Sequence, residues 1–369
     1  MKMLKGLKLS MMLMFVMISP IEGWSQGASV ENTQQPSYLS WLRKLKHEAA
    51  QAGISESTIM LLDKAQLDPR VLELDRRQPE AIQPLAVYMN KRIESALGGG
   101  QKRLKQHKAL LGKVAKQYKV PPELIVALWG VETHFGQITG NFPVIPSLMT
   151  LAYDKRRPAL FRKELMSCLL AVDQKLLSQK NPLTTLKGSW AGAMGQCQFM
   201  PSHFLNKAVD YDKSGDIDLW NSLPDVFASI ANFLHSEGWQ EEAPWGWRVT
   251  LPKDFDSAWI DINHPQPIEV WRKRGFKKLD GLLMIAKPYA LPKIPYQAAL
   301  ICPDGPDVQS AQRSAYLVFP NFMVLMKWNK SQRFGITVGT IVDHLKKGYP
   351  KKSADGKLSY GHYDSVGKG

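Results

Sequence analysis

One carboxyl at the end of a helical pattern is the group best suited to acid–base chemistry. The pattern covers residues 120–136 (VPPELIVALWGVETHFG) and opens on two prolines, which a first helical turn tolerates well. At about 100° per residue, Leu128 and Trp129 share the side of Glu132, while Glu123 points the opposite way. Burial disfavours the charged form of a carboxyl, so Glu132 is predicted to hold its proton and to serve as a general acid. The same pattern also fits a half-buried glutamate that reaches solvent at the rim of the core, or one paired with an arginine.

A second stretch carries the hydrogen-bonding groups that a sugar requires. Residues 188–201 read GSWAGAMGQCQFMP, and their small residues would let a ligand approach the backbone closely. Ser189, Gln196 and Gln198 supply a hydroxyl and two amides, whose hydrogen bonds suit sugar hydroxyls and amides. A tightly packed turn between helices is the alternative interpretation.

Two clusters of cations stand out in the sequence. Lys155, Arg156 and Arg157 stand where a helix is predicted to start, and positive charge there opposes the helix dipole. Either a bound ligand or nearby acids must offset them. The Lys- and Arg-rich stretch 102–118 is predicted to be a solvated helix face, with a binding patch as the alternative. The glycines at 98–100 are expected to separate it from the chain before it.

An acidic loop resembles a calcium-binding loop. Residues 210–221 read DYDKSGDIDLWN, with Gly215 at the sixth position. The candidate metal ligands are Asp210, Asp212, Ser214, Asp216, Asp218 and Asn221. Serine at the fifth position and Asn221 in place of a bidentate glutamate at the twelfth depart from the pattern. A loop of hydrated acids is therefore the alternative, and a bound metal would stabilise the fold rather than do chemistry.

The elements that position these groups are predicted to be mainly helical (α+β). Ser222 is predicted to cap a helix that runs to Glu237, and a last helix is predicted over 332–346. From about residue 245, apolar and polar residues alternate between Pro and Gly, which predicts short strands at 245–251, 257–262 and 267–271. The stretch around Pro320 is predicted to be a hairpin or paired strands.

The N-terminus has the three-part pattern of a secretory signal. Three lysines precede an apolar run over 9–18, and small residues follow it. Cleavage after Ser25 is expected, so the mature protein is predicted to be periplasmic and soluble; an uncleaved anchor is the alternative. No later run is long enough to cross a bilayer, so no transmembrane anchor is expected.

The predicted organisation is a signal peptide (1–25), a flexible lead (26–37), one catalytic unit (38–348) and a disordered tail (349–369). Within the unit, a helical subregion (38–119) precedes the core with the acidic loop (120–245), and β elements with a closing helix follow (246–348).

The net charge of +15 favours a polyanionic partner. No nucleic-acid motif is present, so an acidic wall polymer or lipid headgroups are expected and nucleic acid is not. Cys168, Cys197 and Cys302 allow either one disulfide plus a thiol or three buried thiols. Cys168 shares a helical apolar stripe and is expected in the core.

Taken together, these motifs resemble the lytic murein transglycosylase B family, glycoside hydrolase family 103. The resemblance is carried by VETHFG, GSWAGAMGQCQFMPSHF, DLWNSLPDVFASIANFLHSEGW and VFPNFMVLMKWNKS. It covers nearly all of 38–346, including LDPRVLELDRRQPE. It implies a lysozyme-like helical catalytic core with an N-terminal helical region and small β elements toward the C-terminus. It also implies cleavage of the β-1,4 bond between N-acetylmuramic acid and N-acetylglucosamine, leaving a 1,6-anhydromuramoyl end.

The resemblance implies roles for individual residues. Glu132 matches the single catalytic acid/base. The residues implied to bind substrate are Ser189, Gln198 and Asn329 for the sugars, Trp328 at an aromatic position that is often Tyr, and Arg156 and Arg157 for the peptide stem. The acidic loop matches an EF-hand-like metal site. Phe233 and Cys197 depart from the family pattern, and the cysteine that anchors lipid-modified members is absent.

The implied chemistry needs one carboxyl and no cofactor beyond a structural Ca²⁺. A lone acid suffices where the acetamido group of the substrate assists, an exception to the usual pair of carboxylates. The expected partners are peptidoglycan glycan strands and cell-wall or secretion complexes. A lysozyme-type hydrolase and a non-catalytic wall-binding protein are the alternative functions.

Overall fold

The computed structural model describes residues 38–77, 84–177, 181–279, 289–305 and 314–347. The predicted signal peptide, lead and tail lie outside these residues. None of the helices in the described part is long and apolar enough to cross a bilayer.

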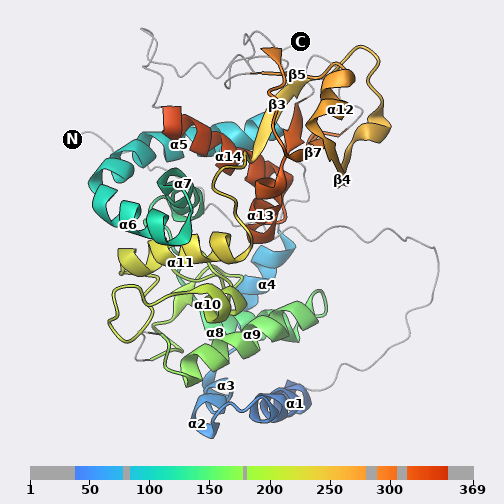
Figure 1. The fold of residues 1–369 in the computed structure, drawn as a ribbon. Coiled ribbons are helices and arrows are strands. Elements are labelled where there is room, and N and C mark those ends of the chain that lie inside the picture. Colours follow the sequence, from blue (N-terminus) through green and yellow to red (C-terminus); the bar gives the residue numbers. More distant parts are fainter. Residues whose placement is uncertain (1–37, 78–83, 178–180, 280–288, 306–313, 348–369) are drawn as a thin grey trace, which may run out of the picture.

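Helices build the larger part of the molecule, as Figure 1 shows. In chain order they are α1 (Tyr38–Gln51), α2 (Glu56–Ile59), α3 (Leu61–Lys64), α4 (Pro69–Arg76), α5 (Leu85–Gln106), α6 (Lys108–Tyr118), α7 (Pro122–Thr133), α8 (Val144–Tyr153), α9 (Pro158–Asp173), α10 (Pro201–Lys207), α11 (Leu223–Ser236), α12 (Ile268–Lys273), α13 (Pro320–Trp328) and α14 (Gln332–Lys347). The predicted mainly helical α+β class is confirmed.

Helix α7 lies at the centre of the helical body. Every residue from Leu124 to Val131 is buried, and α5, α14, α6 and α11 pack around the helix. Neighbouring helices therefore cover α7 on all sides. The helix ends at Thr133, after which His134 and Phe135 both have positive φ, at 51° and 61°. This turn leaves Glu132 in the last helical turn.

The break expected at the glycines of 98–100 is wrong, because α5 continues straight through them. These glycines instead allow close packing. A Cβ built on Gly99 would lie 2.2 Å from the ring of Phe135, and one on Gly100 would lie 2.9 Å from Leu345. Phe135 and α14 can therefore approach α5 only because those side chains are missing. Gly98 has open space around it.

Two antiparallel sheets accompany the helices. The small sheet pairs β1 (Phe142–Pro143) with β2 (Lys187–Gly188). The larger one contains β3 (Gly246–Thr250), β4 (Asp261–Pro267), β5 (Lys277–Lys278), β6 (Tyr289–Ala290), β7 (Gln297–Ile301) and β8 (Ala315–Val318) in the order β4-β7-β8-β3-β5-β6. A short 3₁₀ helix, Ser257–Trp259, precedes β4, so the first half of the strand expected at 257–262 is wrong. The Asp256 carboxylate accepts from the Ala258 amide and starts this helix.

The inner strands β7 and β8 of the larger sheet are buried on both faces. Successive side chains of a strand point to opposite faces. In β8, Tyr316 and Val318 join the core of the helical body, whereas Ala315 and Leu317 join a second core around Trp271. The sheet is thereby fixed to the helical body while covering a small core of its own.

Two further strand predictions are wrong. Residues 267–271 enter helix α12, because Ile268 and Trp271 are buried three residues apart and Arg272 bonds to Glu269 across one turn. The hairpin expected around Pro320 is a strand followed by a helix.

In that helix, α13, Pro320 occupies the first turn, which suits its missing N–H. The buried Asn321 side chain donates to the carbonyls of Gln240 and Ala243 and accepts from the amide of Gln240. These bonds fix the start of α13 against the loop after α11.

Other local predictions are confirmed. The Ser222 hydroxyl accepts from the Asp225 amide at the start of α11, and α14 covers the predicted last helix. The three cysteines are separate buried thiols, and Cys168 lies in the core.

The packing around the glycines of α5 predicts opposite effects of two alanine substitutions on stability. Gly98→Ala should raise the free energy of unfolding by about 0.5–1 kcal/mol, because alanine favours a helix and meets no neighbour. Gly99→Ala should lower it by about 1–3 kcal/mol, because its methyl group meets the Phe135 ring. Urea unfolding of both variants beside the wild type measures this. Equal shifts would contradict the packing role of Gly99.

Candidate active site

The carboxyl of Glu132 is half-buried at the C-terminal end of α7. Trp328 Nε1 donates a hydrogen bond of 2.7 Å to its Oε1. Burial raises the pKa of Glu132 to about 7, although the Trp328 hydrogen bond and the charge of Arg92 favour the ionised form. A carboxyl with a pKa near neutrality can both give and take a proton at physiological pH.

The indole of Trp328 is held in place by other aromatic rings. Its centroid lies 4.9 Å from that of Phe233 on α11 and 5.3 Å from that of Phe199. Three separate parts of the chain therefore meet at Glu132. Because an indole N–H only donates, Oε1 is the acceptor in both protonation states. The acid proton then belongs on Oε2.

Sequence reasoning missed two neighbours of Glu132 on α5. The Arg92 guanidinium carbon lies 3.7 Å from the ring centroid of Tyr88, and Arg92 also donates to the Tyr88 carbonyl at 3.1 Å. Burial raises the pKa of Tyr88; the charge of Arg92 lowers it and that of Glu132 raises it. The spacing of the two residues suits one helix face, but nothing in the sequence connects that face with Glu132.

Cys197 also lies close to the carboxyl. Burial raises the pKa of its thiol above the ordinary value, and the charge of Glu132 adds to this effect. The thiol is therefore protonated and apolar in character. It forms part of the low-dielectric surroundings that keep the pKa of Glu132 high.

Ser189 and Gln198 lie in the loop between β2 and α10. The Ser189 Oγ accepts from the Ala193 amide at 3.0 Å, which leaves its O–H able to donate. Gln198 has a φ of 52°, and its Nε2 donates to the carbonyls of Thr139 and Gly195. Within the described residues its Oε1 has no hydrogen-bond donor. Among the described residues of this loop, the Ser189 O–H can thus still donate a hydrogen bond and the Gln198 Oε1 can still accept one.

Gln196 has a structural role. Its Oε1 accepts from Trp129 Nε1 at 2.8 Å, its Nε2 donates to the Trp220 carbonyl at 2.6 Å, and its own carbonyl accepts from the Thr133 hydroxyl at 2.8 Å. These bonds join the loop to the end of α7 and to the acidic loop. The amide that seemed available for a sugar is used inside the protein.

Asn329 follows Trp328 and is buried at the end of α13, where its Oδ1 accepts from the Ser331 amide at 3.1 Å. Chain continuity therefore places it beside the Trp328–Glu132 pair. Its role toward sugars remains a prediction.

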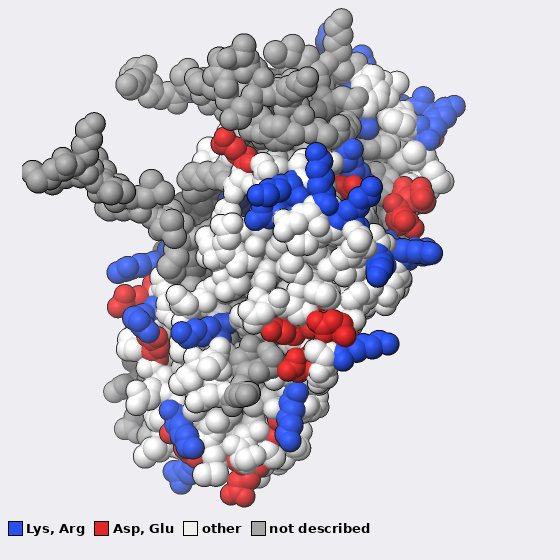
Figure 2. Space-filling model, turned by 90° about the vertical axis from the view of Figure 1, so that its left-hand side faces the viewer, with Lys and Arg blue, Asp and Glu red and all other residues white. Residues whose placement is uncertain are grey.

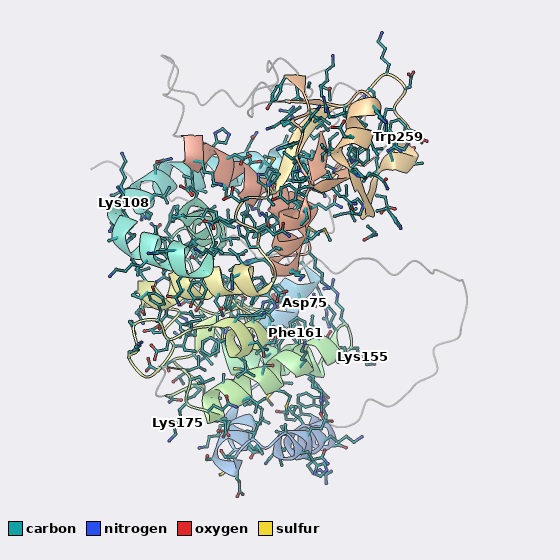
Figure 3. The ribbon with its side chains drawn as sticks, viewed as in Figure 1. Asp75, Lys108, Lys155, Phe161, Lys175 and Trp259 are labelled. Carbon is teal, nitrogen blue, oxygen red and sulfur yellow. The ribbon has the colours of Figure 1, made fainter. Side chains whose placement is uncertain are left out.

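Arg156 and Arg157 are compensated by an acid that the sequence did not single out. Both bind the carboxylate of the buried Asp75 on α4, and Arg156 also donates to the Asp75 carbonyl at 2.6 Å. In Figure 3, Asp75 lies near Phe161, on α9, which these arginines precede. The Arg157 side chain is 14% exposed and that of Arg156 is 41% exposed, so Arg156 retains more donors toward solvent.

The acidic loop collects a set of carboxylates different from the predicted one. Oxygens of Asp210, Asp212 and Asp225 lie within 4.8 Å of one another. Asp225 is fully buried in α11, beyond the twelve-residue frame in which ligands were sought. Asp218 instead accepts from the Asn221 backbone and side chain and so closes the turn.

The cluster has the chemistry of a calcium site. Burial raises the pKa of Asp225, and the nearby Asp212 carboxylate adds to this effect. Calcium prefers such carboxylate oxygens, and a divalent cation would offset their mutual repulsion. The residues therefore fit the metal that the loop pattern suggested.

The sequence matches a known domain family over most of its length. The model of the transglycosylase SLT domain matches residues 37–343. Membrane-bound lytic murein transglycosylase B of Escherichia coli (strain K12) is 32% identical over 238 residues, which are 63% of this chain and 59% of that protein. The chain therefore spans about three fifths of the length of this curated relative.

Solved structures share the fold. SltB3 from Pseudomonas aeruginosa, in complex with NAG-NAM-pentapeptide, has a TM-score of 0.75 and 34% identity, over 86% of this chain and 83% of that one. The Escherichia coli lytic transglycosylase Slt35, in complex with calcium, has a TM-score of 0.67 and 25% identity, over 83% and 92%. The chain belongs to the transglycosylase SLT domain family, and its predicted resemblance to lytic murein transglycosylase B and its lysozyme-like fold are confirmed.

Proposed function

We propose that this protein is a peptidoglycan lytic transglycosylase that cleaves the bond from N-acetylmuramic acid to N-acetylglucosamine and leaves a 1,6-anhydromuramoyl end. Glu132 is the single acid and base. The observation that carries the proposal is a half-buried glutamate whose carboxyl has a pKa near 7 and is oriented by Trp328. Family membership and the muropeptide bound to SltB3 support the choice of substrate.

In the first step, Glu132 donates the proton on Oε2 to the glycosidic oxygen. The bond from that oxygen to C1 of the muramoyl sugar breaks, and the N-acetylglucosamine side leaves with the proton. The acetamido oxygen of the muramoyl sugar bonds to C1 and stabilises the positive charge, which replaces the second carboxylate of ordinary glycosidases. Within the described residues, no second carboxylate contributes to the pKa shift of Glu132.

In the second step, the Glu132 carboxylate takes the proton of the C6 hydroxyl of the same sugar. Oxygen O6 bonds to C1, the bond from the acetamido oxygen to C1 breaks, and the protonated acid is restored. The raised pKa suits both steps, because proton donation and recovery are then nearly balanced at neutral pH.

The remaining polar groups bind the substrate in this proposal. The Ser189 hydroxyl and the Gln198 carbonyl oxygen face the sugars with Asn329, and the exposed part of Arg156 pairs with a carboxylate of the peptide stem. Asp75 orients both arginines for this contact. The setting is the periplasm, where glycan strands are available.

The acidic loop is proposed to hold a structural Ca²⁺ through Asp210, Asp212 and Asp225. The ion would supply positive charge to a buried carboxylate cluster and no catalytic chemistry. Its effect on the site would pass through Gln196, which is bonded to the carbonyl of Trp220 in the same loop.

Glu132→Gln tests the acid/base assignment. The amide cannot donate or recover a proton in this way, so release of soluble muropeptides from purified sacculi should fall by at least about 100-fold. Glu123→Gln, a change on the same helix, should retain most activity. Mass spectrometry of the wild-type products should show the anhydro form, one water lighter than the hydrolysed form. Substantial activity of Glu132→Gln would contradict the assignment.

The pH profile tests the role of Trp328. Because the acid form starts the reaction, the rate should fall as pH rises through about 7. Trp328→Phe removes a donor that favours the ionised carboxylate, so the alkaline limb should move to higher pH and kcat should fall. Trp328→Tyr, which can still donate, should restore the wild-type limb at least in part. A phenylalanine variant with changed KM but an unchanged profile would show that Trp328 only binds sugar.

Calcium binding is tested by thermal unfolding. Added Ca²⁺ should raise the melting temperature and a chelator should reverse the rise, because a ligand that binds only the folded state stabilises it. Asp225→Asn should abolish the calcium effect, whereas Asp254→Asn, an exposed change outside the loop, should preserve it. A melting temperature that does not respond to calcium would show that the acidic loop does not bind the ion.

A further inference from the structure

Helix α6 and the last turns of α5 form a basic surface that the proposed reaction does not use. Between residues 95 and 122 the chain carries seven Lys and Arg residues and no Asp or Glu. The six lysines are exposed: Lys102, Lys105, Lys108, Lys113, Lys116 and Lys119. Within the described part of the chain, none of the seven cations forms an ion pair. Arg103 lies over the ring of Phe135 instead.

The lysines of α6 lie on one side of the helix. Leu111 and Tyr118 are buried against the helical body. At about 100° per residue, Lys113 and Lys116 lie on the side opposite these buried residues, and Lys108 lies on the flank beside them. Lys108 extends outward at the edge of the molecule in Figure 3. Figure 2 shows this side face on, with Lys and Arg side chains gathered over its upper half and an acidic group below them.

The surface recognises charge and does not insert into an apolar phase. In the described residues from 102 to 119, no large apolar side chain is exposed. None of the six lysines lines the pocket that Arg103, Gln106 and His107 border at the end of α5. An array of exposed cations without apolar contacts suits a diffuse anionic surface, such as bilayer headgroups, because each cation gains from the potential without specific geometry. A folded acidic protein would instead require complementary contacts.

The placement of the surface is compatible with activity. In Figure 1, α6 lies at one edge of the body, and α7 separates it from α13, which carries Trp328. Contact through α6 therefore leaves the Glu132–Trp328 side free to meet glycan strands.

We propose that these six lysines dock the protein on an anionic phospholipid bilayer. Binding is electrostatic and reversible, and it weakens as salt screens the charges over about 10 Å. The proposal goes beyond the reaction above, since it would hold whatever the protein does to peptidoglycan.

Vesicle co-sedimentation tests the docking surface. The exported form of the protein is used, so that the apolar N-terminal run does not contribute. It should bind vesicles containing phosphatidylglycerol, bind less as salt rises, and leave pure phosphatidylcholine vesicles unbound. K108E/K113E/K116E should lose at least about tenfold in affinity, since each basic residue near the surface is worth roughly a factor of five.

A matched control separates the surface from net charge. K44E/K175E/K253E replaces three exposed lysines elsewhere and changes the net charge by the same amount. It should bind the vesicles nearly as the wild type does. Equal loss in the two triple variants, equal binding to neutral vesicles, or binding to sacculi alone would overturn the proposal. Activity of K108E/K113E/K116E on detached sacculi should equal that of the wild type, so the two proposals can fail separately.

Discussion

The structure depends on keeping one carboxyl away from bulk water while leaving it accessible. Glu132 is surrounded closely enough for burial to raise its pKa to about 7, and Trp328 fixes one of its oxygens by a 2.7 Å bond. Burying a carboxylate without a hydrogen bond or a nearby positive charge would cost folding free energy. The hydrogen bond from Trp328 and the charge of Arg92 limit that cost without restoring an ordinary pKa. The balance of these opposing effects makes one residue suitable for both proton transfers.

The rest of the chain holds that arrangement in place. Glycines in α5 admit Phe135 at the end of α7, and Gln196 joins α7 to the loop with Ser189 and Gln198. The same glutamine reaches the acidic loop, so the carboxylate cluster and the site share one hydrogen-bond network. On the other side, the larger sheet supports α13 and thus Trp328. The carboxyl of Glu132 is therefore held in place by segments that lie far from it in the sequence.

Much of this arrangement could be predicted from the sequence, because local patterns decide it. The Pro pair and apolar run gave α7 and placed Glu132 in its last turn, and Ser222 capped α11 as expected. The predictions that were wrong concern features that tertiary packing determines. The glycines of α5 look like a helix break until Phe135 is placed against Gly99. Asp75 and Tyr88 act across long separations in sequence, where spacing carries no information. Asp225 was missed because it lies outside the twelve-residue loop in which ligands were sought. The sequence around Pro320 predicted a hairpin because proline is common both at helix starts and at the ends of strands, and the sequence alone does not separate the two.

The most direct test of the central claim is digestion of sacculi in water enriched in heavy oxygen, followed by mass spectrometry of the new muramoyl ends. If Glu132 delivers the sugar's own O6 to C1, these ends should be anhydro and carry no heavy oxygen. Muramoyl ends that have gained one heavy oxygen atom would show that water is the acceptor. The protein would then be a hydrolase built on the same fold, and the proposed second proton transfer would be wrong.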